Sequence, residues 1–189
     1  MLVLALSASI PAQADDYTTT PAQFLYCTVC HGVELKGNKS VDAPKLNGMA
    51  QWYVLSQLQA FKSGRRGTHS QDLIGLEMRP MAAVLTDEQL EQAAAYVTSI
   101  PTRRAQATLG GDALKGETLY KTCAVCHGPR AQGDEALHAP QLAGQSDWYL
   151  VRQLEKYLAG VRGSSPDDTW GAQMQSSALV LADKRAITD

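Results

Sequence analysis

Two short motifs in this chain of 189 residues carry the same chemically active side chains at the same spacing. They consist of Cys27, Cys30 and His31, and of Cys123, Cys126 and His127. The Cys-x-x-Cys-His pattern is typical of c-type haem attachment, in which both thiols bond to the haem vinyl groups and the histidine binds the iron. The sequence therefore predicts two covalently bound haem c groups.

Other uses of paired cysteines fit this spacing poorly. A structural zinc site expects its second Cys-x-x-Cys about 15–20 residues further on, whereas Cys30 and Cys123 are 93 positions apart. A thioredoxin-like dithiol expects a neighbouring βαβ pattern, and the sequence offers no such strands. Since all four cysteines lie in the two motifs, none is left for a disulfide framework or a nucleophile.

Length and charge narrow the remaining classes. The chain is long enough for two small domains, each near the size at which a protein core alone is marginal, so an apolar cofactor would add to both cores. The net charge of −2 and the isoelectric point near 6.1 provide no basic field for nucleic acid. We therefore expect no nucleic-acid partner.

The first residues resemble an export signal. An apolar run over residues 2–10 is followed by Ala12-Gln13-Ala14, which is typical of a cleavage site, although no basic residue precedes the run. The run is too short to span a bilayer. We expect residues 1–14 to be the remnant of a signal peptide, with the mature protein starting at Asp15 in the periplasm. The alternative is that Met1 is the true start of an unusual tail.

Propensity and capping signals predict mostly helix. Thr20 as N-cap and Pro21 at the first position predict a helix that reaches Cys27. A second helix is expected over residues 50–62, ended by Gly64, and residues 65–80 are expected to form a loop. Thr86 and Gln89 form a capping box that predicts a helix to about Ser99. The second helix carries an apolar stripe of Trp52, Leu55, Leu58 and Phe61.

The second half of the chain repeats the first at a constant offset of 96 positions. The offset relates Pro44 to Pro140, Trp52 to Trp148, Gln57 to Gln153, Gly64 to Gly160 and Arg66 to Arg162, as well as the two motifs. Such self-similarity indicates a duplicated domain. We expect domains at residues 15–100 and 112–189, joined by a linker at 101–111. Because Asp189 corresponds to Ala93 and Ala182 to Thr86, the last helix is expected to be short or the chain incomplete.

The repeat also ranks the candidates for the second protein ligand of each iron. After its haem motif the second half contains one methionine, Met174, and the offset of 96 selects Met78 as its counterpart. Met81 corresponds to Ser177 and is the alternative in the first half. His69 and His138 correspond to Ser165 and Asp42, so neither belongs to the repeat.

After each haem motif the chain continues with Pro-x-Leu-x-Gly, an aromatic residue, Gln-Leu, Gly-x-Arg and a methionine. In this arrangement it resembles the dihaem cytochromes c4. The resemblance implies an all-α protein of two tandem class I cytochrome c domains, related by a pseudo-twofold axis. It implies that the carbonyls of Pro44 and Pro140 orient His31 and His127. It also makes three pairs candidates for contacts to haem propionates or to the domain interface: Trp52 and Trp148, Tyr53 and Tyr149, and Arg66 and Arg162.

An iron bound by histidine and methionine leaves no open position for a substrate, so the ligand set favours electron transfer over catalysis. With the resemblance, we expect a periplasmic carrier in a respiratory chain. It would take electrons from a quinol-oxidising complex or a dehydrogenase and pass them to a terminal oxidase. Peripheral attachment to the inner membrane is compatible with this role. The alternative is a dihaem subunit of a larger oxidoreductase, such as a flavocytochrome sulfide dehydrogenase.

Overall fold

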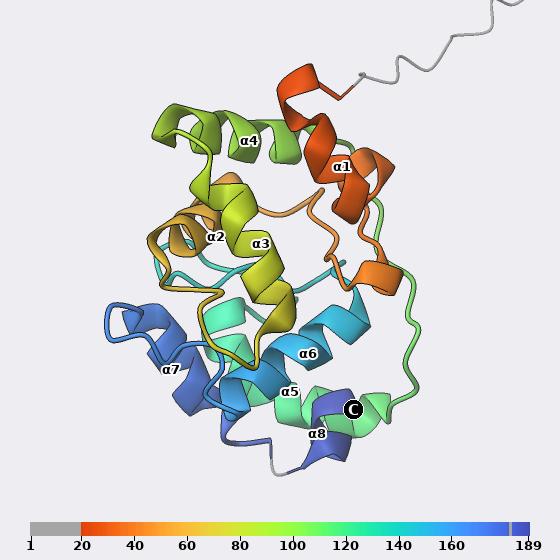
Figure 1. Ribbon diagram of the computed structural model, residues 1–189. Coiled ribbons are helices and arrows are strands. Elements are labelled where there is room, and N and C mark those ends of the chain that lie inside the picture. The colour runs from red at the N-terminus through yellow and green to blue at the C-terminus, as the bar shows by residue number, and fades with distance from the viewer. Residues whose placement is uncertain (1–19, 182) are drawn as a thin grey trace, which may run out of the picture.

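The computed structural model describes residues 20–181 and 183–189 (Figure 1). The expected signal segment, the expected start at Asp15 and the position of Ala182 lie outside the described residues. Within the described part the chain forms helices and two isolated β-bridges, but no strand. The all-α fold expected from the sequence is therefore confirmed.

The first half of the chain forms a helical unit in the upper part of Figure 1. Its elements are η1 (Ala22–Phe24), α1 (Leu25–His31), η2 (Val33–Leu35), η3 (Lys39–Val41), α2 (Gln51–Ser63), α3 (Leu73–Ala83) and α4 (Asp87–Ser99). Helix α2 packs against both α3 and α4. Of its predicted apolar stripe, Leu55 and Leu58 pack against the core and Phe61 is buried, whereas Trp52 lies against His138 of the second half. The buried core consists of Leu35, Val54, Ala94, Val97 and Ile100.

The second half repeats this arrangement in the lower part of Figure 1. Its helices are α5 (Ala113–His127), α6 (Asp147–Leu158), α7 (Thr169–Ala178) and α8 (Lys184–Thr188). Helix α6 packs against α7 and α8, and α5 packs against α8. The last helix is short, as expected, and Asp183 caps it by accepting a hydrogen bond from the Ala186 N–H at 2.8 Å. The cap therefore lies one residue after the position that corresponds to Thr86.

The prediction for the first helix was partly wrong. Pro21 has extended backbone angles (φ −52°, ψ 139°), so it precedes the helix instead of opening it. Its carbonyl accepts a hydrogen bond from the Phe24 N–H at 2.8 Å, which forms the short turn η1 before α1 begins. Helix α1 then continues through Cys27 to His31. The whole haem motif therefore lies on one helix.

The predicted loop over residues 65–80 was also wrong, because α3 begins at Leu73. Asp72 caps this helix by accepting a hydrogen bond from the Gly75 N–H at 3.0 Å. Pro80 lies inside the helix and leaves the carbonyl four residues earlier without its helical partner. The packing of α3 on α2 offsets this cost. Met78 is consequently held on a helix.

The other helix ends follow the predicted signals. Thr86 Oγ1 accepts from the Gln89 N–H at 3.2 Å, and Gln89 Oε1 accepts from the Thr86 N–H at 2.9 Å, which completes the capping box of α4. Helix α2 ends at Gly64, whose φ of +80° is the left-handed conformation that glycine adopts readily. These local signals were strong enough to determine where α4 begins and where α2 ends.

Candidate haem-binding sites

The first Cys-x-x-Cys-His motif lies on α1, and His31 is the last residue of that helix. The His31 side chain is 7% exposed, and its Nδ1 lies 2.8 Å from the Pro44 carbonyl oxygen. Cys27 is half-buried and Cys30 is exposed, and both are free thiols. Two accessible thiols one helical turn apart, beside an oriented imidazole, are what covalent haem attachment requires.

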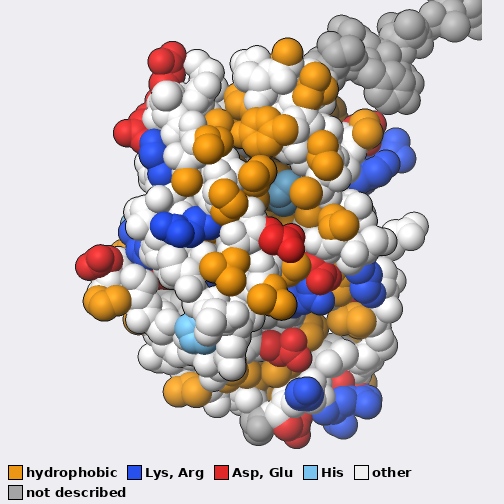
Figure 2. All heavy atoms as spheres, viewed as in Figure 1, with side chains coloured by type: hydrophobic (Ala, Val, Ile, Leu, Met, Phe, Trp, Pro, Cys, Tyr) orange, Lys and Arg blue, Asp and Glu red, His pale blue; other side chains and the backbone are white. Residues whose placement is uncertain are grey.

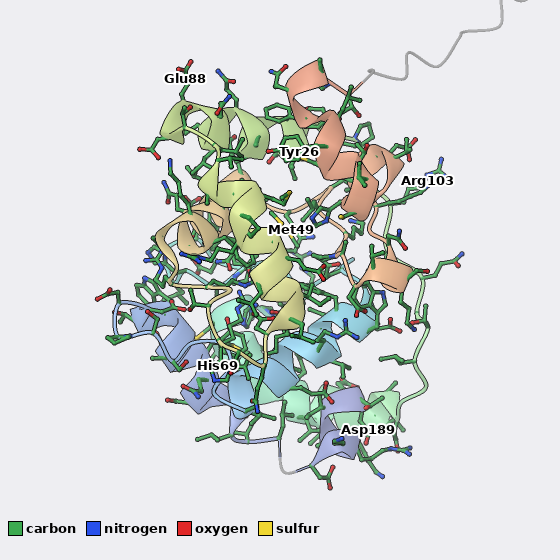
Figure 3. All side chains as sticks on the ribbon, viewed as in Figure 1. Tyr26, Met49, His69, Glu88, Arg103 and Asp189 are labelled. Carbon is green, nitrogen blue, oxygen red and sulfur yellow. The ribbon has the colours of Figure 1, made fainter. Side chains whose placement is uncertain are left out.

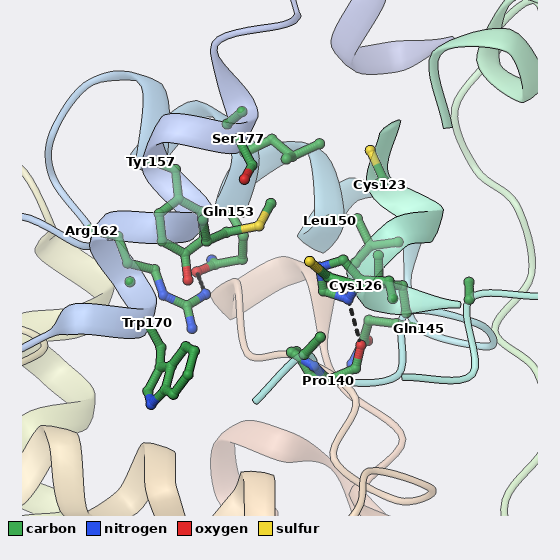
Figure 4. Close-up of a pocket in the computed structure, with 18 of the residues that line it drawn as sticks. Cys123, Cys126, Pro140, Gln145, Leu150, Gln153, Tyr157, Arg162, Trp170 and Ser177 are labelled. Carbon is green, nitrogen blue, oxygen red and sulfur yellow. Dashed lines mark hydrogen bonds between the residues drawn. The ribbon is translucent and has the colours of Figure 1, made fainter. Parts of the chain in front are cut away.

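The second motif lies in the same way at the end of α5. His127 is buried, and its Nδ1 lies 2.8 Å from the Pro140 carbonyl oxygen. Cys123 and Cys126 line a cavity of about 640 Å³ together with His127. Figure 4 shows both cysteines on one side of this cavity and aromatic and cationic side chains across from them, among them Tyr157, Arg162 and Trp170.

Both imidazoles are prepared to bind a metal through Nε2. A carbonyl oxygen only accepts hydrogen bonds, so the Nδ1 atoms of His31 and His127 must carry the proton and donate it. Burial lowers the pKa of both histidines, although the bond to the proline carbonyl opposes this shift. The neutral imidazole therefore exposes an unprotonated Nε2.

The structure places the methionines of the repeat at matching positions. Met78 lies in α3 and Met174 in α7, and both side chains are half-buried. Met174 lines the same cavity as Cys123 and His127. Met81 is 44% exposed, and its counterpart Ser177 donates a hydrogen bond to its own helix at 2.9 Å.

Hydrophobic side chains gather on the face that carries the first site. Figure 2 shows them over the upper half of this face, where Figure 1 places α1 and α3. The exposed ones on these helices include Leu25, Val29, Leu73 and Leu76. An apolar surface of this kind suits an apolar ligand or partner.

The two histidines outside the repeat make local contacts. His69 lies on the loop between α2 and α3 (Figure 3), and its Nδ1 accepts a hydrogen bond from the Gln71 N–H at 3.2 Å. His138 is exposed and stacks on Trp170, with ring centroids 4.3 Å apart. The His138 ring also lies nearly perpendicular to the ring of Trp52 from the first half of the chain, with ring centroids 6.1 Å apart.

A network of arginine, glutamine and tyrosine side chains joins the two halves between the motifs. Arg66 donates to Gln57 in its own half at 2.7 Å, and to Tyr149 and Gln153 in the other half at 3.3 and 3.1 Å. Arg162 repeats these bonds with every partner exchanged. It donates to Gln153 at 2.6 Å, to Tyr53 at 3.0 Å and to Gln57 at 2.9 Å. This exchange is the pseudo-twofold relation that the family resemblance implied.

The network holds two guanidinium groups with no carboxylate among these partners. Burial raises the pKa of Tyr149, but the positive charges of Arg66 and Arg162 outweigh burial and leave that pKa below its usual value. The Nε of Arg66 is buried without a hydrogen-bond partner. Both arginines line the cavity that holds the second motif. The cavity therefore offers thiols at one side and unneutralised cations at another, which fits a haem with its propionate carboxylates.

Two further contacts between the halves had no signal in the sequence. Lys156 Nζ lies 2.5 Å from Asp72 Oδ1, the carboxylate that caps α3. Arg152 pairs with Asp42 and lies over the ring of Trp148. Neither pair recurs at the equivalent positions of the repeat, because Ala60 and Ser56 stand where the cations would be. The offset relates Asp72 to Asp168 but relates Asp42 to His138, so the repeat conserves one member of the first pair and neither member of the second. The repeat could therefore not have revealed these contacts.

Comparisons with known proteins agree with this geometry. The cytochrome c family model matches twice, over residues 21–101 and residues 113–187. A thiosulfate dehydrogenase electron acceptor of Stutzerimonas stutzeri (strain A1501) is 35% identical over 187 residues, which covers 89% of this chain and 82% of that protein. Cytochrome c4 of Azotobacter vinelandii is 32% identical over 184 residues, which covers 90% of this chain and 84% of that protein.

The likeness extends to three dimensions. The crystal structure of reduced recombinant cytochrome c4 from Pseudomonas stutzeri superposes with a TM-score of 0.67 at 27% identity, covering 88% of this chain and 90% of that one. The duplicated motifs fit two covalently bound haem c groups, one in each half. The chain therefore belongs to the cytochrome c family, as a dihaem electron-transfer protein of the cytochrome c4 type with two tandem cytochrome c domains.

Proposed function

We propose that this protein is a periplasmic electron carrier in which each haem iron has one histidine and one methionine ligand. His31 and Met78 hold the first iron, and His127 and Met174 hold the second. One observation carries the proposal: the two sites are equivalent in geometry. Each histidine donates to a proline carbonyl at 2.8 Å, and each methionine occupies the same position on a helix capped by an aspartate.

This ligand set limits the chemistry to electron transfer. Haem supplies a one-electron couple when bound, and two protein ligands on each iron leave no position for a substrate. The proline carbonyls fix the imidazoles, and the helices α3 and α7 fix the thioethers. Because these groups are held by regular structure, little reorganisation accompanies a change of oxidation state.

The electron donor in this proposal is a dehydrogenase, and a thiosulfate dehydrogenase is the first candidate. The relative from Stutzerimonas stutzeri bears the name thiosulfate dehydrogenase electron acceptor and aligns along most of both chains. The acceptor is a terminal oxidase. A quinol-oxidising complex is the competing donor, and the test below separates the two.

Location and domain limits belong to the same proposal. Residues 1–14 are the remnant of an export signal, and they precede a domain at 15–100, a linker at 101–111 and a domain at 112–189. No helix of residues 20–181 and 183–189 is both long and apolar enough to cross a membrane. N-terminal sequencing of the exported holoprotein should begin at Asp15, and a start at Met1 would contradict the signal assignment.

Anaerobic mixing experiments test the carrier role. The oxidised holoprotein is mixed with thiosulfate and a thiosulfate dehydrogenase, and separately with a quinol-oxidising complex and its quinol. We expect rapid uptake of two electrons per chain from the dehydrogenase, and no change in the ferrous spectrum when carbon monoxide is added. Rapid reduction only by the quinol-oxidising complex would show that this complex, and not the dehydrogenase, is the donor. Stoichiometric carbon monoxide binding would overturn the ligand assignment.

A further inference from the structure

Lys45 is a buried cation that breaks the equivalence of the two domains. Its side chain is only 6% exposed, which is rare for lysine. Its ammonium donates to the Asn47 carbonyl and to Thr102 Oγ1, the latter at 2.7 Å. Both acceptors are neutral, so no carboxylate offsets the charge in these contacts. Burial lowers the pKa of Lys45, as expected for a desolvated ammonium.

The backbone of Lys45 is directly joined to the first haem site. It directly follows Pro44, whose carbonyl accepts the hydrogen bond from His31 at 2.8 Å. Its own backbone carbonyl accepts a hydrogen bond from Gln145 Nε2 of the second domain at 2.8 Å. Gly37, with φ +88°, covers the Lys45 backbone so closely that a Cβ there would lie 2.6 Å from the Lys45 nitrogen. These contacts fix the Lys45 backbone, and the two hydrogen bonds of the ammonium hold the charge.

The second domain has the same local structure without the charge. Gln141 corresponds to Lys45, and its Nε2 donates to the Ala143 carbonyl at 2.8 Å. Ala143 corresponds to Asn47 in the repeat, so the two side chains make the same hydrogen bond to the same backbone position. Gln141 is exposed and neutral. The interface arginines Arg66 and Arg162, in contrast, occur once in each domain, so the repeat keeps this pair of charges.

We propose that the charge of Lys45 raises the reduction potential of the first haem relative to that of the second. A ferric haem carries one more positive charge than a ferrous haem. A fixed cation in a region of low dielectric constant disfavours the ferric form, and the potential rises. This inference rests on the proposed two-haem carrier, since it concerns how one of its two centres is tuned.

The test compares midpoint potentials of holoprotein variants by spectroelectrochemical titration. Lys45→Gln is the main variant, because the second domain already shows that glutamine fits this backbone and makes the same bond. We expect one of the two midpoints to fall and the other to remain unchanged. Lys45→Arg should restore the wild-type values. Gln141→Lys places a solvated charge at the equivalent position and should move the other midpoint upward by a smaller amount.

The outcomes separate this inference from the carrier proposal. If Lys45→Gln carries two haems and both midpoints are unchanged, or both move equally, the role of Lys45 is disproved and the carrier role stands. If Lys45→Gln loses haem, Lys45→Leu is measured instead, because it is neutral and fills the buried space. An unchanged or raised potential of the first haem in that variant overturns the inference. A wild-type chain that binds fewer than two haems contradicts the carrier proposal itself.

Discussion

Arg66 and Arg162 each donate a hydrogen bond to the glutamine of the opposite domain, at 3.1 Å to Gln153 and at 2.9 Å to Gln57. Each also donates to the glutamine of its own domain. Every glutamine oxygen in this pair therefore accepts from both arginines. The network ties the two haem sites together through four side chains from four different segments of the chain.

Replacing either arginine by glutamine should destabilise the holoprotein. We expect Arg162→Gln and Arg66→Gln each to lower the free energy of unfolding by about 2 kcal/mol, because hydrogen bonds to charged groups are lost and buried acceptors are left unpaired. The double variant should lose less free energy of unfolding than the two single variants together, because both arginines donate to the same glutamine oxygens. Denaturant unfolding measures all three. The exposed Arg103→Gln is the control and should change stability by less than about 0.5 kcal/mol. If the two losses in free energy of unfolding are additive, the two arginines act independently and do not form one network.

Removing the proposed methionine ligands should change the ferric absorption spectrum. We expect Met78→Ala and Met174→Ala each to remove about half of the long-wavelength band that accompanies sulfur ligation, because each iron loses its thioether. Met81→Ala is the matched control, since Met81 is more exposed and lies one turn further along α3. If Met81→Ala loses the band and Met78→Ala keeps it, Met81 and not Met78 is the ligand of the first iron.

Two equivalent glycines should resist substitution. Gly67 and Gly163 have φ of +76° and +83°, and a Cβ at either would lie 2.4 Å from a backbone oxygen of α3 or α7. Alanine at either position should cost about 2–4 kcal/mol of stability, from the left-handed backbone and the close contact. Thermal unfolding of the holoprotein measures the cost. Gly110→Ala, which has nothing within 4 Å, should be nearly neutral. Equal stability of all three variants would contradict this packing.

The proposed linker, which contains Thr108 and Leu109, should detach from α6 in acid. Asp147 accepts hydrogen bonds from the Thr108 and Leu109 N–H groups and from the Thr108 hydroxyl. Partial burial raises its pKa, but these bonds outweigh burial and lower the pKa to about 2. The folded pKa is below the usual value, so the stabilisation is complete above about pH 4 and is lost as the pH falls toward 2.

Asp147→Asn should therefore lower stability by about 1 kcal/mol at pH 7, a value that allows for screening by solvent. The difference from the wild type should shrink between pH 4 and pH 2, as followed by urea unfolding. Glu91→Gln, at an exposed position of α4, is the control and should show no such convergence. A difference that stays constant down to pH 2 would show that the carboxylate of Asp147 does not anchor the linker.

The amino-acid sequence by itself determined the cofactor, the duplication and the all-α fold. Covalent haem attachment needs its thiols and imidazole within five consecutive residues, so this chemistry is visible in the chain before folding. The constant offset of 96 paired Met78 with Met174 because duplication preserves register. Capping signals such as Thr86 with Gln89 act within a single helical turn, which is why the start of α4 was predicted correctly.

Only the tertiary structure decided which side chains meet across the domains and which charges are buried. Arg66 and Gln153 are 87 positions apart, and residues of these types are ordinarily exposed. Their contact depends on how α2 and α6 face each other. Helix α3 exists although Pro80 opposes it, because packing against α2 supplies more stability than local preference removes. The burial of Lys45 depends likewise on the fold around Asn47 and Thr102, which no local pattern specifies.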